Sequence, residues 1–179
     1  LSDLIVNRFQ YAITSGREMY RMVNEKMRMS KSTIFNWLRH GAEFLENCQE
    51  TIKQWLLKPG STIYCDESWV DTKVTDANGE VHYKKRYMWV IVNLTTKVCY
   101  YLYGSRKKEV IKEFLGDFKG TLMTDAYAAY LYFNKLKDGT HVCCWSHVRR
   151  LFVSANRDYK DTLAQAFIDL IGILYKVEV

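Results

Sequence analysis

The chain contains a single proline, and the pair Pro59-Gly60 divides the sequence into two parts of different character. Residues 1–58 carry apolar side chains in steps of three and four, which is the spacing of amphipathic helices. A proline followed by a glycine ends a helix. We therefore predict an all-helical region at residues 1–58 and a second region of different structure at residues 61–179.

The second part alternates between strand-like and helix-like segments. Asn78-Gly79 predicts a hairpin turn. Runs rich in Tyr, Val, Ile and Thr predict strands at residues 61–65, about 85–94, about 97–103, about 119–124 and about 140–144. Helices are expected at about 106–116, at about 126–135 and from about 145 to the end. Three antiparallel strands followed by α/β alternation predict an α/β fold, a ribonuclease H-like core in which helices flank a mixed sheet.

Composition narrows the classes of protein. The net charge of +6 and the pI near 9.0 permit nucleic-acid binding without requiring it. Five irregularly spaced cysteines give no disulfide framework and favour a reducing cytoplasm. No apolar run is long enough to cross a bilayer, which excludes a membrane location. The sequence lacks an initiator Met and ends within a helical pattern, which predicts a fragment.

Two aspartates each follow an apolar, strand-like run. Asp66 follows residues 62–65, and Asp125 follows residues 120–124. Carboxylates at the mouths of neighbouring strands can converge, and carboxylate oxygens are ligands that Mg²⁺ prefers. Two such ions, roughly 3.5–4 Å apart, would assist attack on a phosphodiester. Ordinary structural roles explain the same residues, since Asp125 suits a helix N-cap and residues 66–68 suit a turn.

Residues 141–150 carry a second cluster of polar side chains. Cys144 and His147 have a spacing found in zinc sites, but neighbouring cysteines on a strand point to opposite faces, which argues against zinc. Arg149 and Arg150 follow at once, and guanidinium groups at this place would hold phosphates. We predict nucleic-acid contacts for His147, Arg149 and Arg150.

The helical region is locally basic. Residues 17–40 carry six Lys or Arg against two Glu, a net charge of +4. Ser30 or Ser32 can cap a short helix at residues 31–39, and a longer helix is expected at about residues 42–57. Two helices joined at Met29-Ser30 would resemble a helix-turn-helix whose recognition helix is residues 31–39. The side chains predicted to contact DNA are Lys31, Ser32, Thr33, Asn36 and Arg39. A helical bundle with a basic surface explains the pattern equally well.

Seven short motifs, in order and at matching spacing, give the chain a resemblance to a known family. It resembles the DDE transposases of the insertion sequence 66 family over nearly its whole length. The motifs are residues 30–37, 66–68, 84–90, 115–120, 124–130, 144–150 and 174–178. Ser68 stands where the family usually has Thr, a departure that leaves the acidic residues untouched.

The resemblance implies a ribonuclease H-like core that cuts and joins DNA with Mg²⁺ or Mn²⁺. Asp66 and Asp125 would be the first two catalytic acids and would bind the metal. The family's third acid is a glutamate in an Asn-Asn-x-x-Glu-Arg context, which we expect beyond residue 179. Glu178 occupies a different family position. The 179 residues alone are therefore expected to be inactive.

The resemblance also implies partners and a location. The partners would be DNA, both transposon ends and target, and a second copy of the protein in the DNA complex. The location would be the cytoplasm of a bacterium, in association with the nucleoid. The expected function is that of a transposase. The alternative is an inactive remnant that only binds DNA, and a nuclease of the same fold that serves RNA or repair fits less well.

Overall fold

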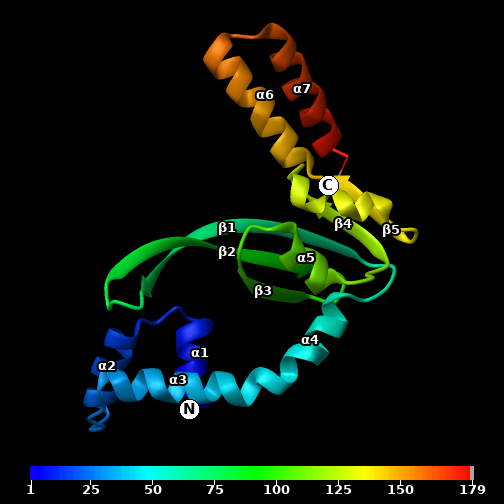
Figure 1. Cartoon of the computed structure of the whole chain (residues 1–179). Helices are drawn as coiled ribbons and strands as arrows, with labels where there is room; N and C mark the ends of the chain where they lie inside the picture. The colour runs from blue at the N-terminus through cyan, green and yellow to red at the C-terminus, as the bar shows by residue number, and fades with distance from the viewer. Residues whose placement is uncertain (178–179) are drawn as a thin grey trace. The chain divides into compact units, whose positions relative to one another are not determined.

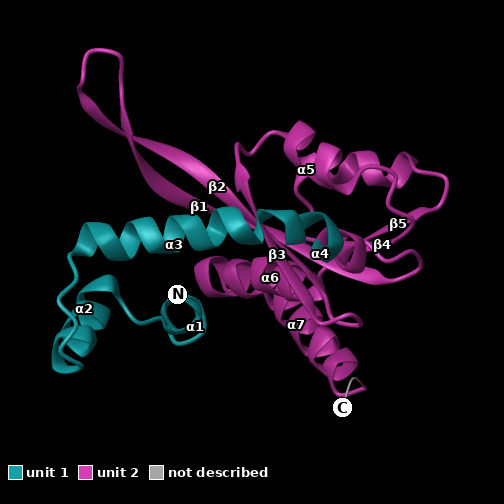
Figure 2. Cartoon of the chain, turned by 90° about the horizontal axis from the view of Figure 1, so that it is seen from below, with its two compact units in different colours: residues 1–52 teal, residues 53–179 magenta. Residues whose placement is uncertain are grey.

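The computed structural model describes residues 1–177, and the chain divides into two compact units, residues 1–52 and residues 53–179 (Figure 2). The first unit is built from helices. These are α1 (Ser2–Phe9), α2 (Ser15–Asn24), α3 (Lys31–Leu45), the 3₁₀ helix η1 (Glu46–Cys48) and the start of α4 (Gln49–Leu56). Thr14 and Ser30 cap α2 and α3, because their hydroxyl oxygens accept backbone N–H groups of the first turn.

The core of the first unit is small. Leu4, Met22 and Ile34, one from each of the first three helices, are buried together. Glu18 is buried beside them, with its side chain 2% exposed, and Arg21 compensates its charge at 2.7 Å. Hydrogen bonding to this guanidinium is the main cause that lowers the pKa of Glu18 below its ordinary value. Three apolar side chains thus join these helices, and the buried Glu18 carboxylate is neutralised from within α2.

The predicted break between two helices near residue 40 is wrong. Helix α3 runs unbroken from Lys31 through Gly41 to Leu45. The physical reason is packing, because a Cβ atom on Gly41 would lie 2.8 Å from a side-chain methyl of Ile5 in α1. The glycine is therefore a close-approach site and does not end the helix. In addition, residues 25–30 separate α2 from α3, a longer connection than the expected turn at Met29-Ser30.

The second unit is built on a five-stranded sheet in the order β3-β2-β1-β4-β5 (Figure 1). The strands are β1 (Thr62–Thr75), β2 (Val81–Asn93), β3 (Val98–Gly104), β4 (Gly120–Thr124) and β5 (Gly139–Cys143). The first three strands pair antiparallel, whereas β4 and β5 run parallel to β1. This mixed sheet confirms the predicted α/β class, and its strand order is consistent with a ribonuclease H-like core.

One face of the sheet carries the main core. Every second residue of a strand points to that face, so Ile63, Trp89 and Leu122 meet there. Helix α5 (Lys108–Leu115) and the 3₁₀ helix η2 (Ala128–Lys135) contribute to the same core, through side chains that include Phe114 and Phe133. The segment at 126–135 is thus helical as predicted, but its geometry is 3₁₀.

A buried amide fixes the start of β1. The Asn93 side chain is fully buried, and its Nδ2 donates to the carbonyl of Leu56 at 2.7 Å and to Ser61 Oγ at 2.8 Å. Its Oδ1 accepts the backbone N–H groups of Thr95 and Thr96 in the β2–β3 turn. One side chain therefore holds the end of α4, the entry to β1 and the turn after β2.

The chain continues with α6 (Trp145–Tyr159) and α7 (Thr162–Tyr175), which pack against each other. The rings of Phe152 and Phe167 stack at a centroid distance of 4.6 Å. Asp161 caps α7 by accepting the backbone N–H groups of Leu163 and Ala164. Within residues 1–177, no helix combines the length and the apolar character that a membrane-spanning segment needs.

Candidate active site

Asp66 and Asp125 line the same cavity, which has a volume of about 370 Å³. Asp66 lies on β1, and Asp125 follows the last residue of β4. These two strands run parallel, with Tyr64 opposite Met123. Asp66 and Asp125 each lie two residues beyond this pair, so they reach the same edge of the sheet. Asp66 does not end its strand as predicted, because β1 continues to Thr75, paired with β2. The two aspartates are nevertheless brought together.

Apolar side chains form the wall of this cavity. Tyr64, Val90, Val92 and Met123 surround the carboxylates on the face of the sheet opposite the main core. Asp66 is exposed, and Asp125 is half-buried. The carboxylates and the apolar wall together form a concave site. Water would only partly screen the charge of a ligand bound there.

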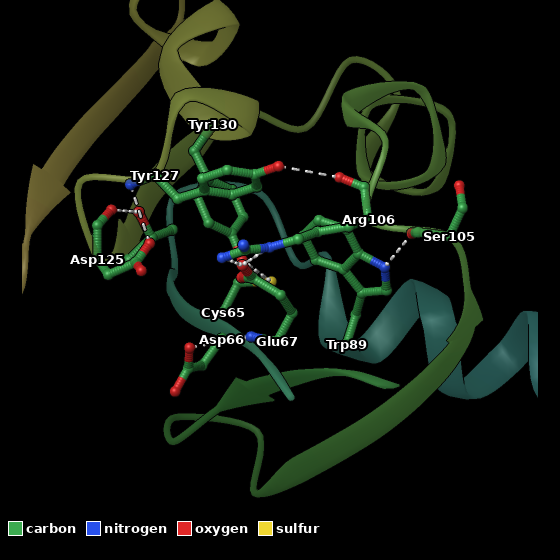
Figure 3. Close-up of polar contacts among 10 residues, drawn as sticks. Cys65, Asp66, Glu67, Trp89, Ser105, Arg106, Asp125, Tyr127 and Tyr130 are labelled. Atoms are coloured by element: carbon green, nitrogen blue, oxygen red, sulfur yellow. Dashed lines mark hydrogen bonds and ion pairs between the residues drawn. The ribbon is translucent and has the colours of Figure 1, made fainter. Parts of the chain in front are cut away.

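Each carboxylate is held by one backbone N–H group (Figure 3). Asp66 Oδ1 accepts the N–H of Glu67 at 2.9 Å, and Asp125 Oδ1 accepts the N–H of Tyr127 at 3.0 Å. Within residues 1–177, no other hydrogen bond to either carboxylate is present, so Oδ2 of each is available to a ligand. Asp125 does not cap η2, whose N-cap is Tyr127.

An ion pair with a buried carboxylate and a partly exposed guanidinium lies beside the site, on the other face of β1. The Glu67 side chain is 2% exposed, and its Oε1 accepts two hydrogen bonds from Arg106, from Nη2 at 2.8 Å and from Nε at 3.0 Å. The Tyr130 hydroxyl donates to Oε2 at 2.8 Å. Both carboxylate oxygens of Glu67 are therefore engaged, and Glu67 cannot join Asp66 and Asp125 as a ligand without breaking these bonds.

Arg106 connects β1 with the segment that follows β4, where Asp125 lies. Its guanidinium lies over the Tyr127 ring at 4.1 Å from the centroid, while the Tyr127 N–H holds Asp125. The same guanidinium holds Glu67, the neighbour of Asp66. Sequence reasoning missed this network, because Glu67 and Arg106 are 39 residues apart and neither lies in a recognisable charge pattern.

Two groups below the site are held neutral by burial. Burial raises the pKa of the Cys65 thiol to about 12, and it also raises the pKa of the Tyr130 hydroxyl. Burial lowers the pKa of His141, against the opposing effect of the Asp125 charge. Its Nε2 lies 2.9 Å from Thr124 Oγ1. Cys65 and Tyr130 thus act as neutral hydrogen-bonding groups.

Among the residues of the 141–150 segment predicted to contact nucleic acid, His147 shares a cavity with both aspartates. It lies in the first turn of α6 and lines the cavity of Asp66 and Asp125. Its Nδ1 is buried and has no hydrogen-bond partner among the described residues. Arg150 lines an adjoining cavity with Asp125 and His147, whereas Arg149 lines neither.

A group of side chains that could share a metal ion without rearrangement lies outside this cavity. Within residues 1–177, the group that meets this condition is Asp76, Glu80 and His82, at the turn between β1 and β2. All three are on the surface, and His82 already bonds Asp76 at 3.0 Å. Within residues 1–177, the group of metal-type ligands does not include Cys144 or His147.

The residues predicted to contact DNA in the first unit lie on the first three turns of α3. The Ser32 and Thr33 hydroxyls bond Ser30 Oγ at 2.7 and 2.9 Å, so they also serve the helix start. Arg39 Nε lies 3.8 Å from Glu43. The exposed members of the set are Lys31, Ser32, Asn36 and Arg39. Glu178 lies outside the described residues.

Arg21 adds little to the basic character of residues 17–40. Its guanidinium contacts three carboxylates, those of Asp3, Glu18 and Glu25, at 3.0, 2.7 and 2.6 Å. Basic character available to a ligand therefore comes from the other cations of the segment.

Comparison with known proteins adds the family. No curated protein sequence matches the chain. Among solved structures, the chain is similar to one described as the Drosophila P element transposase strand transfer complex, with 12% sequence identity and a TM-score of 0.47. The match covers 88% of this chain and 43% of that one, so this chain spans less than half of its length. The model of the family described as "Transposase IS66 family" matches residues 1–179. The chain therefore belongs to the IS66 family of transposases.

Proposed function

We propose that this chain carries part of the catalytic centre of a DNA transposase, a ribonuclease H-like core that cleaves phosphodiesters and transfers strands at transposon ends. One observation carries the proposal: Asp66 and Asp125, from two paired parallel strands, line one cavity. Such a pair of carboxylates is suited to hold divalent metal, and the membership of a transposase family supports DNA as the substrate.

The donor set fits Mg²⁺ or Mn²⁺. Both ions take oxygen ligands, and Asp66 and Asp125 each have a carboxylate oxygen without a partner in the described part of the chain. A site for two ions needs a third carboxylate, and Glu67 is unsuitable because Arg106 and Tyr130 occupy both of its oxygens. We propose that a glutamate downstream of residue 179 supplies it.

The residues in and near the cavity have different proposed roles. When bound, the metal would neutralise charge on the attacking and leaving oxygens of the phosphodiester. Asp66 and Asp125 orient the site, since their backbone hydrogen bonds hold one oxygen of each in place. His147 offers a buried ring nitrogen, and Arg149 and Arg150 supply positive charge near the start of α6 to phosphate oxygens.

Binding of Mn²⁺ to the chain tests the proposed ligands. We expect Asp66→Asn and Asp125→Asn each to weaken binding at least tenfold, because an amide replaces a charged ligand. Titration calorimetry or the paramagnetic signal of Mn²⁺ measures the affinity. Asp76→Asn is the matched control, since it removes one carboxylate from the other group of metal-type ligands. Loss of binding in the Asp76 variant alone would show that the ion binds at the hairpin turn and would contradict the proposal.

We also propose that residues 1–58 bind DNA and residues 61–179 form the catalytic core, with two copies of the protein acting together on DNA. The support in the first unit is the start of α3. Ser32, Asn36 and Arg39 are spaced by four and three residues, so they share one face of the helix, and all three are exposed. Lys31 and Thr33 complete the proposed contact set in its first turn.

The salt dependence of DNA binding tests the role of α3. Neutralising two phosphate contacts with Lys31→Gln and Arg39→Gln is expected to lower the slope of log K against log salt by about 1.8. Fluorescence anisotropy with a labelled duplex measures this slope. Arg8→Gln with Arg17→Gln removes the same charge from other helices of the unit and is expected to have a smaller effect. An unchanged slope in the α3 variant would contradict this assignment.

The alternative, a remnant that binds DNA without cutting it, predicts salt-dependent DNA binding together with Mn²⁺ binding that is insensitive to Asp66 and Asp125. The two titrations therefore separate the functions. Cooperation of both aspartates in metal binding favours the enzyme.

A further inference from the structure

The hairpin of β1 and β2 is longer than the sheet to which it belongs. Strand β3 pairs with β2 only as far as Tyr87, and β4 pairs with β1 only as far as Tyr64. Residues 70–75 and 81–86 therefore pair only with each other within the described chain. Figures 1 and 2 show them as a two-stranded ribbon that projects beyond the other strands, and we call this segment the arm.

The arm has two chemically different faces. Side chains alternate along a strand, and directly paired residues share a face. One face continues that of Asp66 and includes Thr72 paired with Lys84, and Val70 paired with Arg86. The opposite face includes Asp71 paired with Lys85. Two contacts agree with this division. The Thr72 hydroxyl lies 3.0 Å from the Tyr103 hydroxyl, and the Lys85 ammonium lies 4.9 Å from the Trp69 ring centroid.

Unbalanced positive charge lies on the Asp66 face. Lys84 and Arg86 have no ion pair among residues 1–177, and no acidic residue of the arm shares their face. On the opposite face, Lys73 and Lys85 are balanced in part by Asp71, which stands directly across from Lys85, and Lys85 is engaged with Trp69. The contrast lies between the two faces of one ribbon, so it is independent of the net charge of the protein.

These two cations are aligned with the acidic cavity. Asp66 is paired with Val90, and Arg86 and Lys84 lie four and six residues from Val90 along β2. At about 3.3 Å per residue, they lie roughly 13 and 20 Å along the strand from the level of Asp66. A ligand that reaches from the cavity along this face would therefore need negative charges repeated over a length of this order. A DNA backbone has this property.

We propose that the Asp66 face of the arm binds the phosphate backbone of the DNA that flanks the reacting phosphodiester, with Lys84 and Arg86 as its contacts. This inference rests on the proposed function and adds a DNA contact surface to it. A two-stranded ribbon has dimensions that the major groove can admit, so the arm can approach a duplex closely. Lys84 supplies a compact charge, and Arg86 supplies a planar group that can bond two phosphate oxygens.

A matched pair of double variants tests the arm. Lys84→Gln with Arg86→Gln removes two charges from the Asp66 face, and Lys73→Gln with Lys85→Gln removes two from the opposite face. Each is titrated, in the full chain, against a fluorescein-labelled 30-bp duplex of arbitrary sequence in EDTA between 50 and 200 mM NaCl. The duplex spans several helical turns of about 10 bp each, and the Debye length in this salt range is on the order of 10 Å. The slope of log K against log salt over this range therefore resolves a change of one phosphate contact. Melting curves check that both variants remain folded.

The expected result is face-specific. The Lys84/Arg86 variant should lose about 1.8 from the slope of log K against log salt and bind roughly 10- to 100-fold more weakly at 0.1 M NaCl. The Lys73/Lys85 variant should lose less than half of that slope. Equal losses in both variants would overturn the proposal, because the arm would then act only through net charge.

Two further outcomes separate this inference from the proposed function. Wild-type binding with no change in the Lys84/Arg86 variant would overturn the arm and leave the DNA substrate standing. If the wild-type chain shows no salt-dependent binding, the proposed DNA substrate and the arm both fail. Metal binding in the absence of DNA, measured with Asp66→Asn, then shows whether the acidic site persists without it.

Discussion

Asp125→Asn is expected to lower DNA strand transfer by at least about 10³-fold in an active transposase that contains this chain. The loss of one metal ligand removes several kcal/mol of transition-state charge stabilisation, and each 1.36 kcal/mol is a factor of ten in rate. The substitution is well matched to its purpose. The amide oxygen of Asn can still accept the Tyr127 N–H, so the backbone at the end of β4 keeps its hydrogen bond while the charge disappears.

The measurement is the joining of a pre-cut transposon end to a target duplex, followed over time in Mg²⁺. Asp138→Asn is the control, because this exposed aspartate forms a surface ion pair with Lys119 and lies outside the cavity. Equal melting temperatures would show that the Asp125 variant is folded. Strand transfer at the wild-type rate in Asp125→Asn would contradict the role proposed for this carboxylate.

Arg106→Ala is expected to destabilise the second unit by about 2–4 kcal/mol. The substitution leaves the buried Glu67 carboxylate with the Tyr130 hydroxyl as its remaining hydrogen-bond donor. Removing one partner of a buried pair costs roughly 3–5 kcal/mol, and because the Arg106 side chain is itself 45% exposed, we place the expected cost about 1 kcal/mol below that range. For a unit of this size, the melting temperature should fall by roughly 6–15 °C.

A double-mutant cycle isolates the pair. Glu67→Gln removes the buried charge but keeps an oxygen that can accept the Tyr130 hydroxyl. Adding Glu67→Gln to Arg106→Ala should therefore cost less than the sum of the single changes, and urea unfolding of the four proteins measures the difference. Arg106→Lys keeps the charge without the two-pronged hydrogen bond and should fall between wild type and Ala. A change below about 0.5 kcal/mol in Arg106→Ala would show that Glu67 is adequately solvated without it.

Local signals in the sequence predicted local structure well. Asn78-Gly79 marked the hairpin turn because Gly79 adopts a φ of +83°, which side chains other than glycine rarely tolerate. Ser30 marked the start of α3 because its hydroxyl accepts the Thr33 N–H. The two strand-associated aspartates were also identified from the sequence, since an acidic residue directly after an apolar run is a local sequence pattern.

Features that depend on contacts between distant segments were not visible. Gly41 reads as a helix end in the sequence, yet Ile5 packs against it and α3 continues. The pairing of Glu67 with Arg106 has no local signature, because its geometry arises only when β1 and the segment before α5 meet on the same side of the sheet. The charge asymmetry of the arm needed the pairing register, which assigns Lys84 and Lys85 to opposite faces.

The backbone and the side chain of Tyr127 make two different contacts at the site. The Asp125 carboxylate is held by the backbone N–H of Tyr127, whereas Arg106 packs on the Tyr127 ring. Every amino acid except proline supplies that N–H. A substitution at position 127 can therefore change the packing of Arg106 without removing the hydrogen bond to Asp125. The position of this carboxylate is thus independent of which side chain stands at position 127.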